Sequence, residues 1–190
     1  MPPIKCVILG NCGVGKSSLL HSYINRGFTE PPRFSCGPYL TKVTGPDREL
    51  VDLLIFDTLS SKDCDRINRL SYRHTDVFLL CFSVATPDDF YYVRLRWLPE
   101  VRDHCPPSVP IVLVGTKLEM RESDEFPRLG CITHDQGLML AQEIGALDYR
   151  ECSARQGIGI SEVFESVVQC GLYYRSINRI PRKKGKCVVM

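Results

Sequence analysis

The sequence predicts an α/β fold: one mostly parallel sheet of six strands, with one antiparallel edge strand, flanked by helices. Three observations predict it. Short β-branched runs alternate with helix-length amphipathic stretches, which is typical of parallel strands joined by crossover helices. A loop rich in glycine, residues 10–17, stands between the first strand and the first helix. The turn sequence "GPDRE", residues 45–49, joins the second and third strands as a hairpin, so those two strands run antiparallel.

The individual elements follow from the apolar patterns. The expected strands are Ile4–Leu9, Tyr39–Thr44, Leu50–Phe56, Val77–Ser83, Ile111–Gly115 and Asp148–Glu151. The expected helices are Lys16–Asn25, Pro87–His104, Thr133–Glu143 and Ile160–Tyr174. Thr133 or Asp135 is the expected N-cap of the third helix, and Gly145 is its expected end. Because ligands of open α/β sheets bind beyond the carboxyl ends of the strands, we expect the chemistry in the loops that follow strands.

Composition places the chain among ordinary globular proteins. With 190 residues, 44% hydrophobic and 24% charged residues and a net charge of +2, we expect one domain over residues 1–177 and a basic tail over residues 178–190. The ten cysteines show no paired spacing, so we expect reduced thiols that partly fill the core. No apolar stretch reaches the length of a membrane span, and no signal peptide is expected.

The loop "GNCGVGKS", residues 10–17, fits the phosphate-binding pattern G-x-x-x-x-G-K-[ST] between a strand and a helix. Its glycines allow backbone N–H groups to converge on phosphate oxygens, Lys16 supplies a cation, and Ser17 offers a hydroxyl to Mg²⁺. Asp57, at the end of the third strand, is expected to belong to the same metal and phosphate site. The expected phosphate-binding residues are Cys12, Gly13, Val14, Gly15, Lys16, Ser17, Ser18 and Asp57.

Several longer segments resemble small GTPases of the Rho family, above all its Rac-like branch. These segments are "LSYRHTDVFLLCFSV", "WLPEVRDHC" and "VPIVLVGTKLE". The resemblance extends from Ile4 to the C-terminus and implies the P-loop small-GTPase fold, with GTP or GDP as the ligand and Mg²⁺ as the cofactor. It also implies effector proteins that bind the switch loops, and exchange factors and guanine-nucleotide dissociation inhibitors as regulators.

The resemblance assigns the guanine base to the loops after the fifth and sixth strands. The family has T-K-x-D in the first of these, where the carboxylate accepts two hydrogen bonds from the guanine edge. The implied guanine-binding residues are Phe28, Thr116, Lys117, Glu119, Ser153, Ala154 and Arg155. Glu119 is one methylene longer than the family's Asp, which predicts a loss of nucleotide affinity of about 1 to 3 kcal/mol. If Glu119 is only a surface acid, Glu119→Ala leaves the affinity unchanged.

The family's hydrolytic residues are altered at the exit of the third strand. The family has D-T-A-G-Q there, in which the aspartate orders the waters of the magnesium ion and the glutamine orients the attacking water, so the resemblance implies that Asp57 reaches the metal through water. This chain reads "DTLSS", so Ser60 and Ser61 stand where the family has Gly and Gln. Cys12 stands where the family usually has Gly, and its side chain would crowd the water and an arginine finger. We expect weak intrinsic hydrolysis and a poor response to activating proteins, unless one of the charged residues that follow compensates.

Switch I, expected over residues 28–40, also departs from the family. Ser35 matches the position of the Thr that ligates Mg²⁺ in the GTP state, and it keeps the hydroxyl without the methyl. Pro32 replaces the Tyr that usually covers the phosphates, which predicts weak binding of generic Rac effectors. The charged helix that Rho proteins insert after "TKLE" is shortened to residues 120–131, so partners that read that helix are not expected.

The chain ends in "RIPRKKGKCVVM". Cys187 begins a C-a-a-X pattern, and the terminal Met favours farnesylation of that cysteine. The cations Arg182, Lys183, Lys184 and Lys186 would each add about 1 kcal/mol at an anionic membrane surface. We therefore expect the protein at the cytoplasmic face of the plasma membrane, with a cytosolic pool. A chance terminal cysteine and nucleic-acid binding by the basic run are the alternatives, and we expect no nucleic acid.

Together these features predict a membrane-anchored, GTP-binding switch of Rho type that stays largely GTP-loaded because its hydrolysis is impaired. A link to the actin cytoskeleton is implied by the resemblance alone. Two alternatives stay open: an ordinary cycling GTPase, and a nucleotide-poor interaction scaffold. A P-loop kinase is disfavoured because no lid segment for a second substrate is visible. The nucleotide released by freshly purified protein distinguishes the three, as GTP, GDP or none.

Overall fold

The glycine-rich loop, residues 10–17, follows a strand in the middle of a six-stranded sheet. The computed structural model describes residues 1–31, 36–59, 64–121 and 130–178. The strands are β1 (Ile4–Leu9), β2 (Gly37–Thr44), β3 (Leu50–Asp57), β4 (Val77–Ser83), β5 (Ile111–Thr116) and β6 (Asp148–Glu151). They lie in the order β2-β3-β1-β4-β5-β6, with β2 antiparallel to β3 and every other pair parallel. The predicted fold class, with one antiparallel edge strand, is confirmed.

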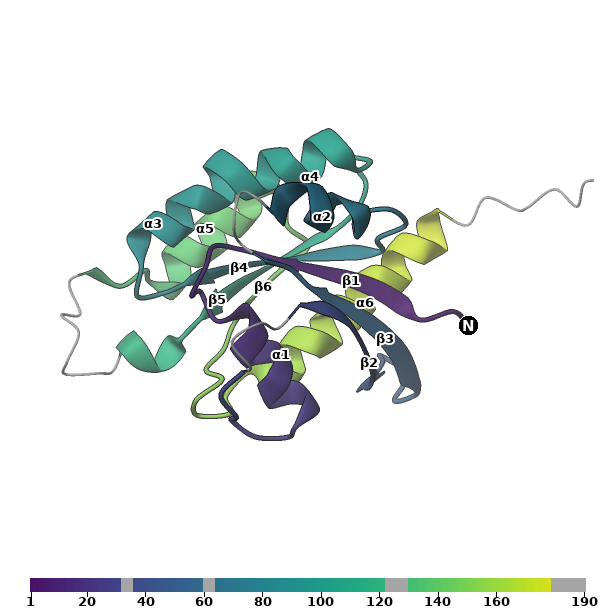
Figure 1. Ribbon diagram of the computed structural model, residues 1–190, viewed down its shortest axis with the longest axis horizontal. Helices are drawn as coiled ribbons and strands as arrows, with labels where there is room; N and C mark the ends of the chain where they lie inside the picture. The colour runs from purple at the N-terminus through teal and green to yellow at the C-terminus, as the bar shows by residue number, and fades with distance from the viewer. Residues whose placement is uncertain (32–35, 60–63, 122–129, 179–190) are drawn as a thin grey trace, which may run out of the picture.

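Helices cover both faces of this sheet (Figure 1). The helices α1 (Lys16–Ile24) and α6 (Ile160–Ile177) lie on one face, and α2 (Asp65–Leu70), α3 (Pro87–Tyr92), α4 (Leu98–His104) and α5 (His134–Ile144) lie on the other. Along β1, Ile4 and Ile8 belong to the core under α1 and α6, whereas Val7 and Leu9 belong to the opposite core. Burial on both faces explains why the strands read as nearly continuous apolar runs. Among the described helices, none combines the length and the apolar character that a membrane span needs.

Capping residues and turn chemistry fix several predicted boundaries. Thr133 begins α5 with a capping box: its hydroxyl accepts from the Gln136 N–H at 3.2 Å, and the Gln136 side chain accepts from the Thr133 N–H at 2.8 Å. Gly145 ends α5 with a φ of 66°, a conformation that glycine adopts without strain. In the hairpin between β2 and β3, the Arg48 N–H donates to the Gly45 carbonyl at 3.0 Å.

The single helix predicted over Pro87–His104 is wrong in its middle. A π-helical segment, η2 (Val93–Trp97), separates α3 from α4. A π turn widens the helix by one residue, and a 3.6-residue apolar period does not reveal it. Two short helices were also missed, α2 and the 3₁₀ helix η3 (Leu118–Arg121), because elements of six and four residues are too short to show a period.

The last described turn of α6 is tied to the N-terminus. The Arg175 guanidinium donates to both carboxylate oxygens of Asp76, at 2.7 and 2.6 Å. It also donates to the carbonyls of Pro2 and Pro3, at 2.7 and 2.6 Å. The point from which the tail continues is therefore fixed to the strand ends, and Figure 1 shows the N-terminus beside this end of α6.

The cysteines among the described residues are free thiols. Cys6, Cys81, Cys152 and Cys170 are buried in the cores. Burial raises the pKa of each of these thiols, that of Cys81 to about 12. These four cysteines act as small apolar residues of the core, as expected.

Candidate nucleotide-binding site

The glycine-rich loop has the backbone shape that the motif predicts. Gly13 and Gly15 have φ values of 76° and 101°, which side chains rarely adopt. Gly10 approaches β4 so closely that a Cβ atom would lie 2.4 Å from the carbonyl oxygen of Cys81. The glycines therefore serve two needs, a left-handed turn and close contact with the neighbouring strand.

Lys16 is buried at the start of α1, with 6% of its surface exposed. Its ammonium group donates to the carbonyls of Gly10 and Asn11, at 2.9 Å each. Burial lowers the pKa of Lys16, and nearby acidic groups, Asp57 among them, oppose that shift. A cation inside a loop of backbone N–H groups is suited to a phosphate ligand.

Ser17 and Asp57 meet where the metal is expected. The Ser17 hydroxyl donates to Asp57 Oδ2 at 2.6 Å, although the two residues are 40 positions apart. Asp57 is buried at the end of β3, in register with Ile8 of β1. A hydroxyl and a carboxylate are hard oxygen ligands of the kind that Mg²⁺ prefers, so the pair fits the ion. Ser17 would ligate it and Asp57 would hold its waters, and the bound ion would neutralise phosphate charge.

The chain beyond Asp57 is anchored on both sides. The Thr58 hydroxyl donates to the Ile8 carbonyl at 2.6 Å, and the Asn68 side chain donates to the Leu59 carbonyl at 2.6 Å.

Among the positions predicted to affect hydrolysis, Cys12 is exposed on the glycine-rich loop. The other positions predicted for switch I metal binding and for hydrolysis lie outside the described residues; they are Ser35, Ser60 and Ser61.

A pocket between α1 and the loops after β5 and β6 has the position predicted for the base. Its lining comprises Gly15, Ser18, Leu19, Phe28, Thr116, Lys117, Glu119, Cys152, Ala154 and Arg155. The pocket brings together all of the predicted guanine-binding residues except Ser153. Ser18, predicted for phosphate, lines this pocket as well.

Thr116 joins the base pocket to the glycine-rich loop. Its hydroxyl hydrogen-bonds to the carbonyl of Val14 and lies 3.0 Å from that of Phe82. Val14, predicted for phosphate binding, is itself fully buried. The loop after β5 is therefore fixed directly against the loop after β1.

Ser153 shapes the loop after β6 and does not line the pocket. It is fully buried, and its backbone N–H and C=O pair with Ile158 at 2.9 and 3.0 Å. Its hydroxyl accepts from the Gln156 N–H at 3.0 Å. These bonds close the turn that presents Ala154 and Arg155 to the pocket.

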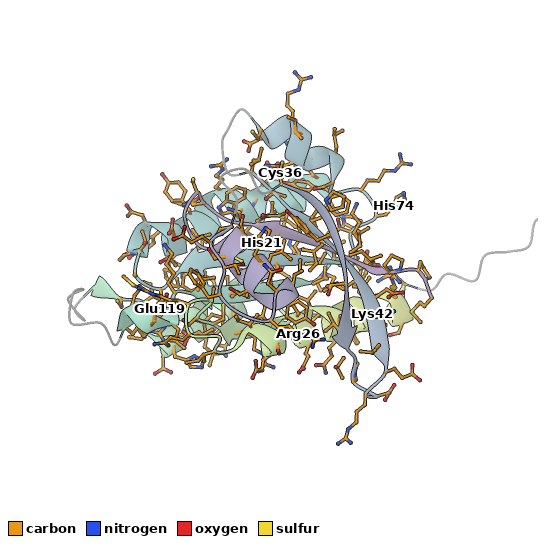
Figure 2. The ribbon with its side chains drawn as sticks, turned by 60° about the horizontal axis from the view of Figure 1, so that its bottom comes forward. His21, Arg26, Cys36, Lys42, His74 and Glu119 are labelled. Atoms are coloured by element: carbon orange, nitrogen blue, oxygen red, sulfur yellow. The ribbon has the colours of Figure 1, made fainter. Side chains whose placement is uncertain are left out.

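Glu119, whose position Figure 2 labels, brings an acceptor into the pocket. Its Oε2 atom is buried and has no hydrogen-bond partner within the described part of the chain. A buried carboxylate oxygen without a donor costs free energy, so the site favours a ligand that supplies N–H groups. The edge of guanine supplies such donors, which fits the predicted ligand.

A side-chain network that the sequence did not reveal holds the two base loops together. Arg121, two residues after Glu119, donates to both carboxylate oxygens of Glu151, at 2.7 and 2.5 Å. The Tyr149 hydroxyl donates to the same carboxylate at 2.6 Å. Burial alone would raise the pKa of Glu151, but these hydrogen bonds outweigh it and hold the pKa below its ordinary value. The sequence did contain one signal for this pair: Arg121 closely follows β5, Glu151 ends β6, and the two strands are neighbours with opposite charges at the same edge of the sheet.

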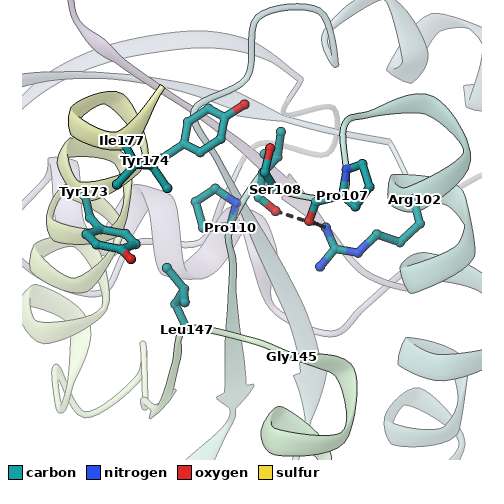
Figure 3. A pocket seen from close by; sticks show the side chains of 10 residues that line it. Arg102, Pro107, Ser108, Pro110, Gly145, Leu147, Tyr173, Tyr174 and Ile177 are labelled. Carbon is teal, nitrogen blue, oxygen red and sulfur yellow. Dashed lines mark hydrogen bonds between the residues drawn. The ribbon is translucent and has the colours of Figure 1, made fainter. Parts of the chain in front are cut away.

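A second hollow lies at the other end of the sheet (Figure 3). It is lined by residues that precede β5 and β6 and by the last turns of α4 and α6, including Pro110, Leu147, Tyr173 and Ile177. The Arg102 guanidinium donates hydrogen bonds to the carbonyls of Pro107 and Val109, at 3.0 Å each. The hollow is thus separate from the nucleotide site, because it lies at the amino ends of the strands.

The fold, the glycine-rich loop and the base pocket together define a P-loop nucleotide-binding protein with a guanine-type base pocket. The chain matches the Ras family over residues 5–171. It therefore belongs to the Ras family of small GTPases, and it is a small GTP-binding switch. Members of this family bind GTP or GDP with Mg²⁺ and act through effector and regulator proteins.

Proposed function

We propose that this small GTPase is a Rho-type switch in membrane-associated signalling that hydrolyses GTP weakly and stays largely GTP-loaded. The main support is the hydrogen bond of 2.6 Å between Ser17 and Asp57, because Asp57 is followed directly by the sequence "TLSS". The groups proposed to hold phosphate and metal lie in contact, while serine stands where the resemblance implies a water-orienting glutamine. The exposed side chain of Cys12 adds bulk on the glycine-rich loop, residues 10–17.

The expected change in rate is large enough to alter the bound nucleotide. Intrinsic hydrolysis by Ras is about 3–5 × 10⁻⁴ s⁻¹, a lifetime of roughly half an hour. Losing about 1.4 kcal/mol of transition-state stabilisation slows hydrolysis tenfold, which gives a lifetime of several hours. A serine hydroxyl is too short to bridge water and phosphate, so a loss of at least this size is expected at position 61.

Two measurements test the proposal. Denaturing freshly purified protein should release mainly GTP, and single-turnover hydrolysis should run at least tenfold slower than in a Rac-like protein with the family's glutamine. Restoring the family residues with Ser60→Gly and Ser61→Gln, alone and with Cys12→Gly, should raise the rate. Release of GDP together with a rate within twofold of the Rac-like protein would favour the cycling GTPase. Release of no nucleotide would favour the scaffold.

We also propose a lipid anchor and a cytoplasmic plasma-membrane location, with signalling to the actin cytoskeleton as the Rho resemblance implies. The support is the C-a-a-X pattern at Cys187 and the basic cluster before it, in a segment that lies outside the described residues. Cys187→Ser should move the protein from the membrane to the soluble fraction. Cys36→Ser, at an exposed cysteine of the domain, is the matched control and should change nothing. Membrane retention of the Cys187 variant would contradict the anchor.

A further inference from the structure

Asn11 occupies a position of the glycine-rich loop that the phosphate motif leaves open, yet its side chain is held on both sides. Its Oδ1 accepts from the Trp97 indole N–H at 3.0 Å, and its Nδ2 donates to Asp89 Oδ1 at 2.9 Å. These partners are 86 and 78 residues away in sequence. The backbone carbonyl of Asn11 also accepts from Lys16 Nζ at 2.9 Å. Any displacement of Asn11 therefore moves an acceptor of the phosphate-binding lysine.

Trp97 is placed by the π-helical segment η2. It is the last residue of η2 and only 2% exposed, in the core that also contains Phe90 and Val93. Core packing fixes the ring, so the indole N–H is offered at one defined point. Single π turns inside helices are frequent at functional sites. A change in the winding of η2 would shift this donor relative to Asn11.

The neighbouring residue, Arg96, connects η2 to α2. Its guanidinium lies 4.4 Å from the centroid of the Trp97 ring and donates to Asp65 Oδ1 at 3.0 Å. Asp65 is the first residue of α2, whose Ile67 and Leu70 are 64% and 80% exposed. Direct contacts thus run from a short helix with two exposed apolar side chains, through η2, to the glycine-rich loop.

We propose that Asn11 and Trp97 are positioning residues for the nucleotide, and that η2 relays movements of α2 to the glycine-rich loop. A protein that binds α2 and displaces Arg96 would loosen the hold on the phosphates through Asn11. The proposal rests on nucleotide binding by the loop and is independent of the rate of hydrolysis. The competing view is that these contacts only pack the core.

A charge-swap cycle separates the two views, with dissociation of fluorescent mant-GDP from the full chain as the readout. Asn11→Asp keeps an acceptor for Trp97 but sets a second carboxylate against Asp89, and it should speed dissociation about tenfold. Adding Asp89→Asn restores a donor–acceptor pair and the original net charge, and it should bring the rate within threefold of the unmodified protein. Adding Asp88→Asn instead, at the exposed neighbouring carboxylate, should not rescue. Equal rates for the two double variants, or no effect of Asn11→Asp, would overturn the positioning role.

Trp97 is the only tryptophan in the chain, so its fluorescence reports this contact directly. The emission should change when GDP is exchanged for GTPγS, and Asn11→Ala should both alter the emission and remove its dependence on the nucleotide. If Trp97 only packs the core, its emission spectrum should be the same with GDP and with GTPγS. That result would overturn the link between Trp97 and the loop.

The relay to α2 has a matched control within η2 itself. Arg96→Ala cuts the contact with Asp65 and should speed mant-GDP dissociation by about threefold or more. Arg94→Ala removes a guanidinium from the same segment, but Arg94 pairs with Glu143 of α5 at 2.5 Å, so the rate should stay unchanged. If the two variants behave alike, the relay through Arg96 is wrong, whatever the charge-swap cycle shows for Asn11.

Discussion

The phosphate half and the base half of the nucleotide site are held in different ways. Apart from Asp57, the phosphate half is one continuous loop, shaped by glycine backbone and centred on the buried Lys16. The base half is assembled from the segments after β5 and β6. Arg121 and Glu151, which join these two segments, are 30 residues apart in the sequence. Backbone conformation therefore shapes the phosphate half, whereas a side-chain network outside the pocket lining shapes the base half, so that a change in this network should affect stability and binding together.

The largest expected effect is at the centre of the phosphate half. Lys16→Ala should weaken GDP and GTP binding at least 100-fold, because each hydrogen bond from a charged group contributes about 1.5–3 kcal/mol and the ammonium can meet several phosphate oxygens. Titration with mant-GDP measures the loss. The far-ultraviolet circular dichroism should stay that of the folded protein.

Lys42→Ala is the control for this variant, because Lys42 is an exposed lysine of β2 that pairs with Asp52 at 2.7 Å. It should leave the affinity unchanged. Retention of GDP affinity within tenfold by Lys16→Ala would mean that the backbone of the loop, and not its cation, dominates phosphate binding.

The next effect tests whether the base half is braced by side chains. Glu151→Gln removes the charge that Arg121 and Tyr149 share, so it should lower the free energy of unfolding by about 2 kcal/mol and weaken GDP binding as well. Urea unfolding of the GDP-loaded and EDTA-stripped forms measures both. Glu143→Gln, at an exposed acid paired with Arg94, should change stability by less than about 0.5 kcal/mol.

The same network predicts how stability depends on pH. Because the folded-state pKa of Glu151 is lowered, its contribution is present above the pKa of an unfolded glutamate, about 4.3, and is lost as the pH falls through the lower folded-state value. Glu151→Gln should flatten the acid limb of the stability curve. An unchanged acid limb would show that Glu151 is not a brace.

These two halves also differ in how well the sequence predicted them. Apolar patterns located the strands and motif spacing located the loop from Gly10 to Ser17, because both depend on residues close in sequence; Asp57 was found because it ends a predicted strand. The contacts of Arg121 with Glu151, and of Asn11 with Trp97, have no local signature, since the partners come together only through the order of the strands. Likewise, the π turn in η2 depends on how its helix packs, and an apolar period does not encode it.

The smallest effect tests Glu119, which stands where the resemblance to Rho-family GTPases implies an aspartate. Glu119→Asp should tighten GDP binding about fivefold, roughly 1 kcal/mol, because the shorter side chain loses less rotamer freedom and brings both oxygens to the base edge together. Competition between GDP and IDP, which lacks the exocyclic amine, measures the gain, and it should be larger for GDP. Glu119→Gln should weaken GDP binding, because it replaces one of the acceptor oxygens by a donor. If Glu119→Asp binds GDP more weakly than the unmodified protein, then the loop from Thr116 to Arg121 is built around the longer carboxylate, and its buried Oε2 is already at the correct distance from the base.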